Sequence, residues 1–259
     1  MNTDRTETTK GYISSGSTAL DQAIVPVEFS GYPAGRVVEI FGPKGVGKTT
    51  LALHAIASCQ AAGGAVAFVD AEQSINLTYA RRAGVQIDDL LVSQPDSAEQ
   101  ALALVESLAA SGAVALVVVD SVEALVPRTE LDGGTVFAGT LARLLSQALR
   151  RLTAIASRTG CCVLFINHLE KRVGSNFTFG PLETTSGGNA LKYYACVRID
   201  VRCTGELRSG GEVVGHRLRA RVVKNKISPP FRQAELQVLF DAPRSTQVVD
   251  VVNVAAVIG

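Results

Sequence analysis

The chain has 259 residues, of which 47% are hydrophobic and 19% are charged. This composition is typical of a soluble globular protein with a large core. Its formal net charge of +1 excludes a globally basic field, so any attraction to nucleic acid depends on a local group of Lys and Arg side chains.

The chain starts with the polar sequence MNTDRTETTK, which lacks the apolar segment of a secretory signal. No uncharged apolar run reaches the roughly 18 residues that a membrane-spanning helix needs. We therefore expect a cytoplasmic protein with no membrane contact. Residues 1–12 also lack apolar periodicity, which predicts a mobile tail before a single domain over residues 13–259. None of the five cysteines lies at CxxC spacing, and we expect reduced thiols in or near the core.

Apolar segments typical of buried strands alternate with segments whose apolar residues recur at helical spacing. The predicted strands are 36–41, 64–70, 115–120 and 161–167, and the predicted helices between them are 48–62, 97–110 and 138–159. Strands that are apolar on both faces and separated by helices belong to parallel sheets covered on both sides. The pattern predicts an α/β fold with a largely parallel central sheet flanked by helices.

The last third of the chain has a different pattern. Here CVRIDVRC, HRLRARVVKN and ELQVLF alternate apolar and charged residues, with turn segments such as RSGGE and no helix between them. This alternation predicts an antiparallel C-terminal strand extension at one edge of the parallel sheet. The apolar end, VVDVVNVAAVIG, is expected to pack on the core as a short strand or helix.

A glycine-rich segment, FGPKGVGKTT, follows the first predicted strand and leads directly into a predicted helix. It matches GxxxxGK[ST], in which backbone amides and the helix N-terminus bind phosphate oxygens. Lys48 is expected to reach the outer phosphates and the Thr49 hydroxyl to ligate Mg²⁺, which predicts an ATP and Mg²⁺ site. The predicted phosphate-binding residues are Gly42, Pro43, Lys44, Gly45, Val46, Gly47, Lys48, Thr49 and Thr50. A glycine turn without a ligand is the alternative interpretation.

Acidic residues follow two of the predicted strands. Asp120 ends ALVVVD, where a carboxylate can hold Mg²⁺ through water, as P-loop sites require. Asp70 ends the strand 64–70 and Glu72 follows it, so either carboxylate is a candidate to act on the attacking water. The alternative for Glu72 and Asp120 is a solvated surface carboxylate in a βα loop.

Many ordered segments of the chain, over roughly residues 13–240, resemble the bacterial RecA recombinase family. They are ISSGSTALD, GRVVEIFGPKGVGKTTLALH, FVDAEQ, YARRAGV, LLVSQPDSAEQAL, SGAVALVVVDSVEALVP, RLLSQALRRL, ETTSGGNALKYYACVRIDVR and VVKNKISPPFRQAE. The set is more specific than the phosphate loop alone, because P-loop proteins have many unrelated activities. The resemblance implies a RecA-like P-loop NTPase core that uses ATP and Mg²⁺. It also implies a DNA-dependent ATPase that binds single-stranded DNA in homologous recombination and DNA repair, with other RecA-like subunits as partners.

The resemblance also assigns roles to individual residues of the nucleotide site. It implies that Glu72 polarises the attacking water and that Asn76 and Tyr79 flank the adenine, with Asn76 in place of the family's Asp. His168 stands where the family has a Gln that senses the γ-phosphate. The peptide between Asp120 and Ser121 is expected to be cis, as in the family.

Basic residues in the second half of the chain are the candidates for contacts with neighbouring subunits and with DNA. Lys224 and Lys226 match lysines that reach the ATP of an adjacent subunit, where they would supply catalytic charge in trans. Two glycine-containing loops, near residues 130–140 and 169–186, match the family's DNA-binding loops. The predicted DNA contacts are Arg143, Arg150, Lys171, Arg172, Phe177 and Phe179. Solvated surface charges are the alternative for each basic residue.

Several departures from the family pattern leave other functions open. Glu170 replaces an Arg that faces DNA, and His168 replaces the sensing Gln. The family's N-terminal helix, which docks on the adjacent subunit, and its C-terminal domain find no match in this sequence. The alternatives are therefore a paralogue that binds ATP but regulates a recombinase with little turnover, and a hexameric P-loop motor.

Overall fold

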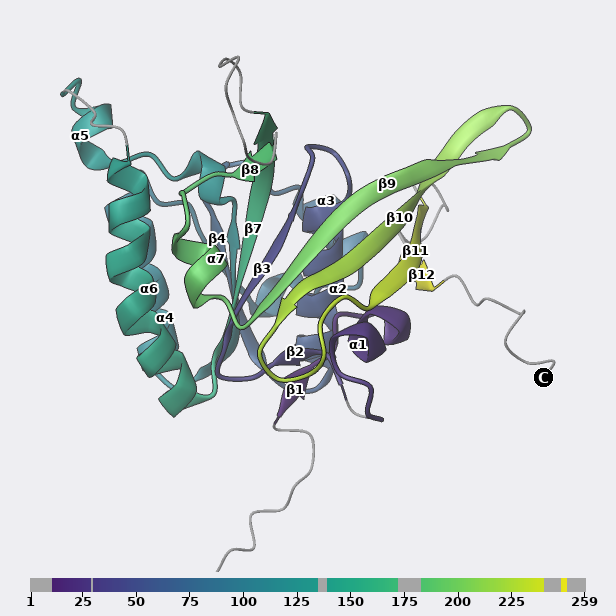
Figure 1. Cartoon of the computed structure of the whole chain (residues 1–259), viewed down its shortest axis with the longest axis horizontal. Coiled ribbons are helices and arrows are strands. Elements are labelled where there is room, and N and C mark those ends of the chain that lie inside the picture. Colours follow the sequence, from purple (N-terminus) through teal and green to yellow (C-terminus); the bar gives the residue numbers. More distant parts are fainter. Residues whose placement is uncertain (1–10, 29, 135–138, 172–182, 240–247, 251–259) are drawn as a thin grey trace, which may run out of the picture.

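A ten-stranded mixed sheet forms the centre of the computed structural model (Figure 1). The structure describes residues 11–28, 30–134, 139–171, 183–239 and 248–250. Strand order along the sheet is β12-β11-β10-β9-β3-β7-β6-β4-β5, and β8 pairs with β7. The strands of its parallel region are β3 (Val37–Gly42), β4 (Ala65–Asp70), β5 (Leu90–Ser93), β6 (Val114–Asp120) and β7 (Cys162–Lys171).

The predicted parallel sheet is confirmed, with strand limits that differ from the predictions by a few residues. Strand β3 lies between β7 and β9, and β4 lies between β5 and β6, all in parallel pairing. In this register Gly42 lies beside His168, and Asp70 lies beside Asp120. The sheet therefore brings the carboxyl ends of β3, β7, β4 and β6 to one edge, where parallel α/β sheets bind their ligands.

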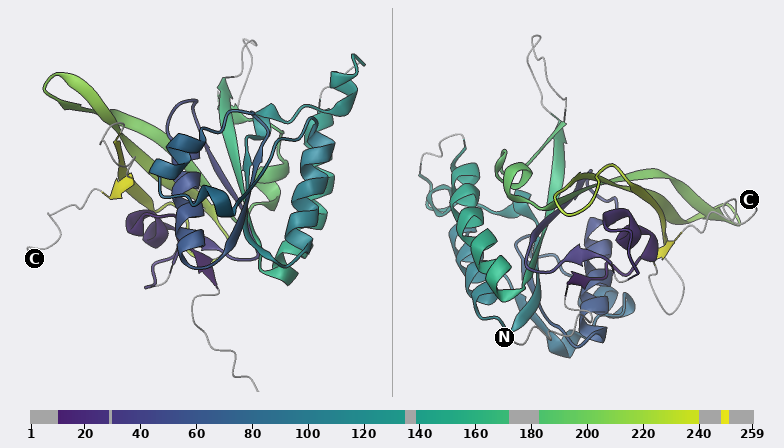
Figure 2. Two further views of the ribbon diagram at one scale, coloured as in Figure 1. Left: turned by 180° about the vertical axis from the view of Figure 1, so that it is seen from behind. Right: turned by 60° about the horizontal axis from the view of Figure 1, so that its bottom comes forward.

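Helices cover both faces of the sheet, as Figure 2 shows. On one face, α2 packs in a core with Val66 and Phe68 of β4, and on the other α4 and α6 pack in a core with Ala67 and Val69. Successive side chains of a strand point to opposite sides, so alternate residues of β4 are buried in the two cores. The helices are α1 (Thr18–Ile24), α2 (Lys48–Ala61), α3 (Leu77–Arg82), α4 (Ala98–Ala110), α5 (Arg128–Leu131), α6 (Thr140–Thr159) and α7 (Ala190–Tyr194), with short 3-10 turns at Ile87–Asp89 and Val122–Ala124.

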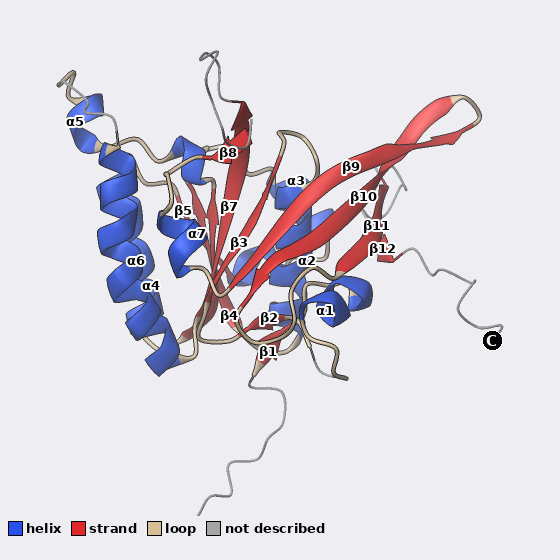
Figure 3. Ribbon diagram, viewed as in Figure 1, coloured by secondary structure: helices blue, strands red, loops and turns tan. Residues whose placement is uncertain are grey.

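The antiparallel extension predicted from residue 195 onward is also confirmed. Strands β9 (Val197–Ser209), β10 (Glu212–Asn225), β11 (Gln233–Leu239) and β12 (Val248–Asp250) follow one another across the sheet, with the short β8 (Glu183–Thr185) beside β7. The outer part of the β9–β10 ribbon projects beyond the rest of the sheet (Figures 1 and 3). Strand β12 confirms the predicted packing of the apolar end for residues 248–250, and residues 251–259 lie outside the described residues.

The N-terminal part of the described chain packs against this scaffold. Strands β1 (Tyr12–Ile13) and β2 (Tyr32–Pro33) form a separate two-stranded sheet, so Tyr12, in the predicted tail, is already paired. Ser17 caps α1 by accepting a hydrogen bond from the backbone N–H of Leu20. Residues 1–10 of the predicted tail lie outside the described residues. No helix in the segments that the structure describes has the length and apolarity needed to cross a bilayer.

Candidate nucleotide-binding site

The glycine-rich loop joins β3 to α2 at the carboxyl edge of the sheet. Gly45 has a φ of 74° and Gly47 a φ of 89°, a left-handed conformation that residues with a Cβ rarely adopt. Gly42 has a different constraint, because a Cβ at this position would lie 2.2 Å from the carbonyl oxygen of Val201 in β9. The loop leads directly into the N-terminus of α2, a helix end that attracts anions.

Lys48, at the first turn of α2, is buried and fully hydrogen-bonded. Its Nζ donates to the carbonyl oxygens of Gly42 at 3.1 Å and Pro43 at 2.7 Å, and lies 3.2 Å from Nδ1 of His168. Burial lowers the pKa of Lys48 to about 8, against the opposing effect of nearby carboxylates. The lysine is held inside the loop by groups with which a phosphate would compete.

The side chains of Thr49, in the first turn of α2, and Asp120, at the end of β6, are in direct contact. The Thr49 hydroxyl donates to Oδ2 of Asp120 at 2.6 Å. Burial raises the pKa of Asp120 to about 6. The peptide between Asp120 and Ser121 is cis, as expected from the resemblance.

Glu72, in the loop after β4, is held by two donors while 34% of its side chain stays exposed. Its Oε1 accepts from the Ser121 hydroxyl at 2.5 Å and lies 3.0 Å from Nε2 of His168. Burial alone would raise its pKa, but these hydrogen bonds, with the charges of His168 and Lys48, bring the pKa of Glu72 below its ordinary value. Glu72 is therefore an ionised carboxylate at neutral pH.

A cavity of about 740 Å³ opens between these groups and the antiparallel extension of the sheet. Its lining combines the phosphate loop with side chains from the ends of β4, β6 and β7 and from β10 and β11. The lining residues are Lys44, Gly45, Val46, Gly47, Lys48, Thr49, Thr50, Ala71, Glu72, Tyr79, Glu123, Ala124, His168, His216, Leu218 and Val238. A concave site with a few convergent polar groups is typical of a ligand-binding pocket.

Some of these lining residues were not predicted from the sequence. Glu123 lies in the 3-10 turn after β6, where its Oε1 is 3.0 Å from Nζ of Lys44 in the phosphate loop. An acid three positions after Asp120 is the only sequence signal for it. His216, Leu218 and Val238 reach the cavity from strands that the sequence predicts only as a sheet extension.

The two predicted adenine contacts occupy different places. Tyr79 lines the cavity, and its hydroxyl is 2.7 Å from the Thr50 hydroxyl. Asn76 is the N-cap of α3 and accepts a hydrogen bond from the backbone N–H of Tyr79 at 2.9 Å. Asn76 is not among the residues that line the cavity, and its contact with adenine stays a prediction.

Lys224 and Lys226, at the end of β10, are absent from the lining of this chain's cavity. Nζ of Lys224 donates to the carbonyl oxygens of Lys192 at 2.7 Å and Tyr193 at 2.8 Å, at the C-terminal end of α7. Lys226 is exposed. A role in the nucleotide site of a neighbouring subunit stays a prediction.

The predicted DNA contacts are only partly within the described residues. Arg143 and Arg150 are exposed on α6, seven positions apart and so on one face of the helix. The side chain of Lys171, and Arg172, Phe177 and Phe179, lie outside the described residues. The β7–β8 pair and the N-terminal end of α6 lie at the same end of the molecule (Figure 1).

The described residues fit a magnesium ion that is bound together with a phosphate ligand. They contain no group of three or more His, Cys, Asp or Glu side chains placed to hold a metal. The Thr49 hydroxyl and the Asp120 carboxylate, 2.6 Å apart, are hard oxygen donors of the kind Mg²⁺ prefers. Mg²⁺ usually keeps several waters and takes its other ligands from substrate phosphates, so two protein groups suffice.

Comparison with known proteins identifies the family of this arrangement. The family model described as the RecA N-terminal domain matches residues 1–244. Protein RecA 1 of Myxococcus xanthus is 54% identical over 230 residues, covering 88% of this chain and 66% of that protein. Protein RecA of Thermus thermophilus is 53% identical over 250 residues, covering 95% of this chain and 72% of that protein.

The chain thus spans about two thirds of the length of these relatives. Nothing in the comparisons supports the regulatory paralogue considered as an alternative function. The family model covers most of the sequence and these relatives are more than half identical, so the chain belongs to the RecA family.

Proposed function

We propose that this chain is an ATPase that binds single-stranded DNA and acts in homologous recombination and DNA repair. The observation that carries the proposal is the convergence of Lys48, Glu72 and Thr49 on one cavity, with Asp120 hydrogen-bonded to Thr49, in a chain of the RecA family. These groups are the phosphate binder, the water-orienting acid and the metal ligands that P-loop hydrolysis requires.

Each group has a chemical task that follows from its position. The loop amides and Lys48 would bind the phosphates, and the Thr49 hydroxyl with the Asp120 carboxylate would hold Mg²⁺. The ion, when bound, neutralises charge on the phosphate oxygens. Glu72 is ionised and partly exposed at the cavity, so its carboxylate can accept a proton or a hydrogen bond from the attacking water.

Contacts outside this chain complete the proposal. Lys224 and Lys226 would supply positive charge to the nucleotide of an adjacent RecA-like subunit, since they do not line the cavity of their own chain. Arg143 and Arg150, exposed on one face of α6, would neutralise DNA phosphates.

ATP hydrolysis by the purified protein, with and without single-stranded DNA, tests the proposal. We expect turnover that rises with DNA, falls as salt increases, and drops by about 100-fold or more in Lys48→Ala, because Lys48 carries the charge closest to the outer phosphates. Arg158→Ala, at the exposed far end of α6, is a surface control that should keep wild-type turnover. Nucleotide binding without DNA-stimulated turnover would contradict the proposal.

A further inference from the structure

A lysine and a glutamate from different elements form an ion pair at the cavity. Lys44 lies in the phosphate loop, directly before the left-handed Gly45, and Glu123 lies in the 3-10 turn Val122–Ala124 after β6. Nζ of Lys44 is 3.0 Å from Oε1 of Glu123, and both residues line the cavity. The ion pair therefore links the phosphate loop to this turn at the site that the proposed reaction uses.

The other carboxylate oxygen of Glu123 lies close to the phosphate-binding lysine. Its Oε2 is 4.0 Å from Nδ1 of His168, and the same ring nitrogen is 3.2 Å from Nζ of Lys48. In P-loop proteins the lysine at this position reaches the β- and γ-phosphates. The Glu123 carboxylate therefore stands next to the place expected for the terminal phosphate of a nucleoside triphosphate.

Both charges of the pair act on Lys48, in opposite directions. Burial is the main cause of the lowered pKa of Lys48, while nearby carboxylates, including that of Glu123, raise this pKa and the ammonium group of Lys44 lowers it further. The two side chains differ in exposure, which is 72% for Lys44 and 30% for Glu123. The lysine, on its long flexible stem, can therefore change partner more easily than the glutamate.

A terminal phosphate would disturb this ion pair, because its negative charge is repelled by Glu123 and attracts Lys44. An exposed ion pair is weak, so a phosphate can compete for the lysine. We propose that Lys44 and Glu123 set the preference of the site for a nucleoside triphosphate over a diphosphate. The Lys44 ammonium group leaves the carboxylate and binds the terminal phosphate, whereas a diphosphate leaves the ion pair intact. This inference rests on the proposed function.

Nucleotide binding measures this preference without hydrolysis. Calorimetric titrations with Mg²⁺ and ADP, and with Mg²⁺ and the non-hydrolysable triphosphate AMP-PNP, give the ratio of the two affinities. In Lys44→Gln we expect AMP-PNP to bind about 5- to 10-fold more weakly and ADP to change by less than about 2-fold, because only the triphosphate reaches the lysine. Lys44→Arg keeps the positive charge and should retain most of the preference.

The glutamate should have the opposite effect on the ratio. Glu123→Gln keeps the size of the side chain and removes its charge, so AMP-PNP should bind about 3- to 5-fold more tightly while ADP binding stays nearly unchanged. Two matched controls, Arg158→Gln and Glu212→Gln, remove one positive and one negative charge at exposed positions that do not line the cavity. Both controls should keep the wild-type ratio.

Two outcomes would overturn the inference. Equal weakening of ADP and AMP-PNP in Lys44→Gln would indicate a general effect on the loop rather than a contact with the terminal phosphate, and a wild-type ratio in Glu123→Gln would show that the carboxylate does not compete. Thermal unfolding of each variant checks that it is folded. If the wild-type protein binds both nucleotides but gives no DNA-stimulated turnover, the proposed function fails, and the affinity ratios still decide the role of the ion pair.

Discussion

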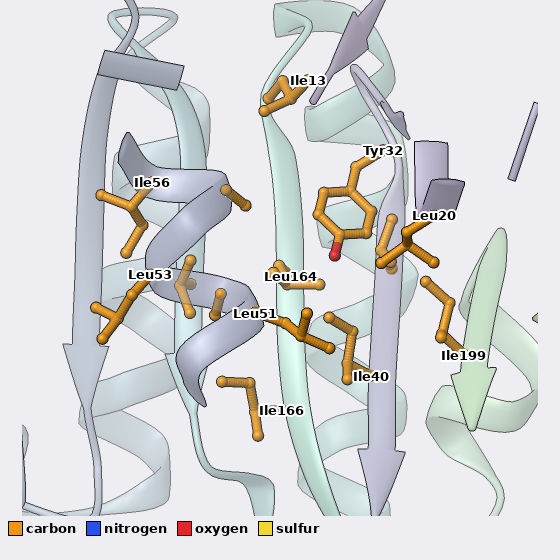
Figure 4. Close-up of a cluster of buried hydrophobic side chains, with 14 of the residues drawn as sticks. Ile13, Leu20, Tyr32, Ile40, Leu51, Leu53, Ile56, Leu164, Ile166 and Ile199 are labelled. Carbon is orange, nitrogen blue, oxygen red and sulfur yellow. The ribbon is translucent and has the colours of Figure 1, made fainter. Parts of the chain in front are cut away.

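Tyr32 is a polar residue that is fully buried among apolar core residues. Its ring and hydroxyl project into the core cluster formed with Ile40, Leu164 and Leu20 (Figure 4). The hydroxyl is buried and has no hydrogen-bond partner among the described residues. Burial raises the pKa of Tyr32 well above its ordinary value, so the hydroxyl stays protonated at neutral pH.

Replacing this tyrosine should therefore not cost stability. A buried hydroxyl without a partner retains its desolvation penalty, so we expect Tyr32→Phe to leave the free energy of unfolding unchanged or raise it by about 1 kcal/mol. Urea unfolding of both proteins at equal concentration measures this difference. A loss larger than about 1 kcal/mol would mean that the hydroxyl has a stabilising partner.

The thiols differ in exposure, which predicts their reactivity. Burial raises the pKa of Cys59 to about 11 and of Cys161 to about 12, and Cys162 and Cys196 are also buried with raised pKa values. Cys203 is exposed on β9, contrary to the expectation of a core or near-core thiol. Because the thiolate is the reactive form, the folded protein should react rapidly with about one equivalent of a disulfide reagent near pH 8.

Two controls accompany this measurement. The Cys203→Ser protein should lose the rapid reaction, whereas the unfolded wild-type protein should react at all five cysteines. Rapid modification of a second thiol in the folded Cys203→Ser protein would show that the core opens on the time scale of the assay.

The close approach of two strands sets the position of the phosphate loop. Strand β9 pairs with β3 in parallel and places the carbonyl oxygen of Val201 where a side chain on Gly42 would lie. Gly42 does not have a positive φ, so the requirement for glycine here is one of space rather than of backbone conformation. The loop therefore depends on how the two strands pack.

Gly42→Ala should destabilise the protein for this reason. The added Cβ would lie 2.2 Å from the Val201 oxygen, and backbone atoms must move to relieve the overlap, at an expected cost of about 1 to 3 kcal/mol in unfolding free energy. Gly205→Ala is the matched control, because Gly205 also lies in a strand but its added methyl group would meet open space, and it should change stability little. Equal effects of the two substitutions in urea unfolding would contradict the packing argument.

Seen as a whole, the molecule places its nucleotide cavity and its predicted DNA contacts on different elements. The cavity lies between the ends of the parallel strands and the antiparallel extension, whereas Arg143 and Arg150 lie on α6. Strand β7 carries His168 and continues toward its pairing with β8, at the end of the molecule where α6 begins (Figure 1). One strand therefore runs from the cavity toward the predicted DNA-binding end.

Binding of single-stranded DNA over a salt series tests this placement. Loss of one phosphate contact should weaken binding and reduce the slope of log affinity against log salt by about 0.7 for each of Arg143→Ala and Arg150→Ala. Arg158→Ala, exposed on the same helix but next to its C-terminal end, should leave both affinity and slope unchanged. Equal effects of all three substitutions would indicate a diffuse attraction rather than a defined contact.

Much of the fold could be predicted from the sequence because its signals are local. Runs such as ALVVVD and the helical spacing in residues 97–110 place strands and helices within a few residues of their observed limits. The order of Gly, Lys and Thr in the phosphate loop also constrains backbone and chemistry within one short segment. The edge strand β5 and helix α3 were not predicted, because both are short and only weakly periodic.

The amino-acid sequence by itself determined the α/β class, the phosphate loop and the family, since each depends on residues that are close together or on an ordered series of matches. Only the tertiary structure decided that His168 joins Lys48 to Glu72 and that Glu123 pairs with Lys44. The physical reason is that these contacts depend on strand order and register, which bring β3, β7, β6 and β4 together from distant parts of the chain. No local sequence pattern predicts which of these distant residues come into contact.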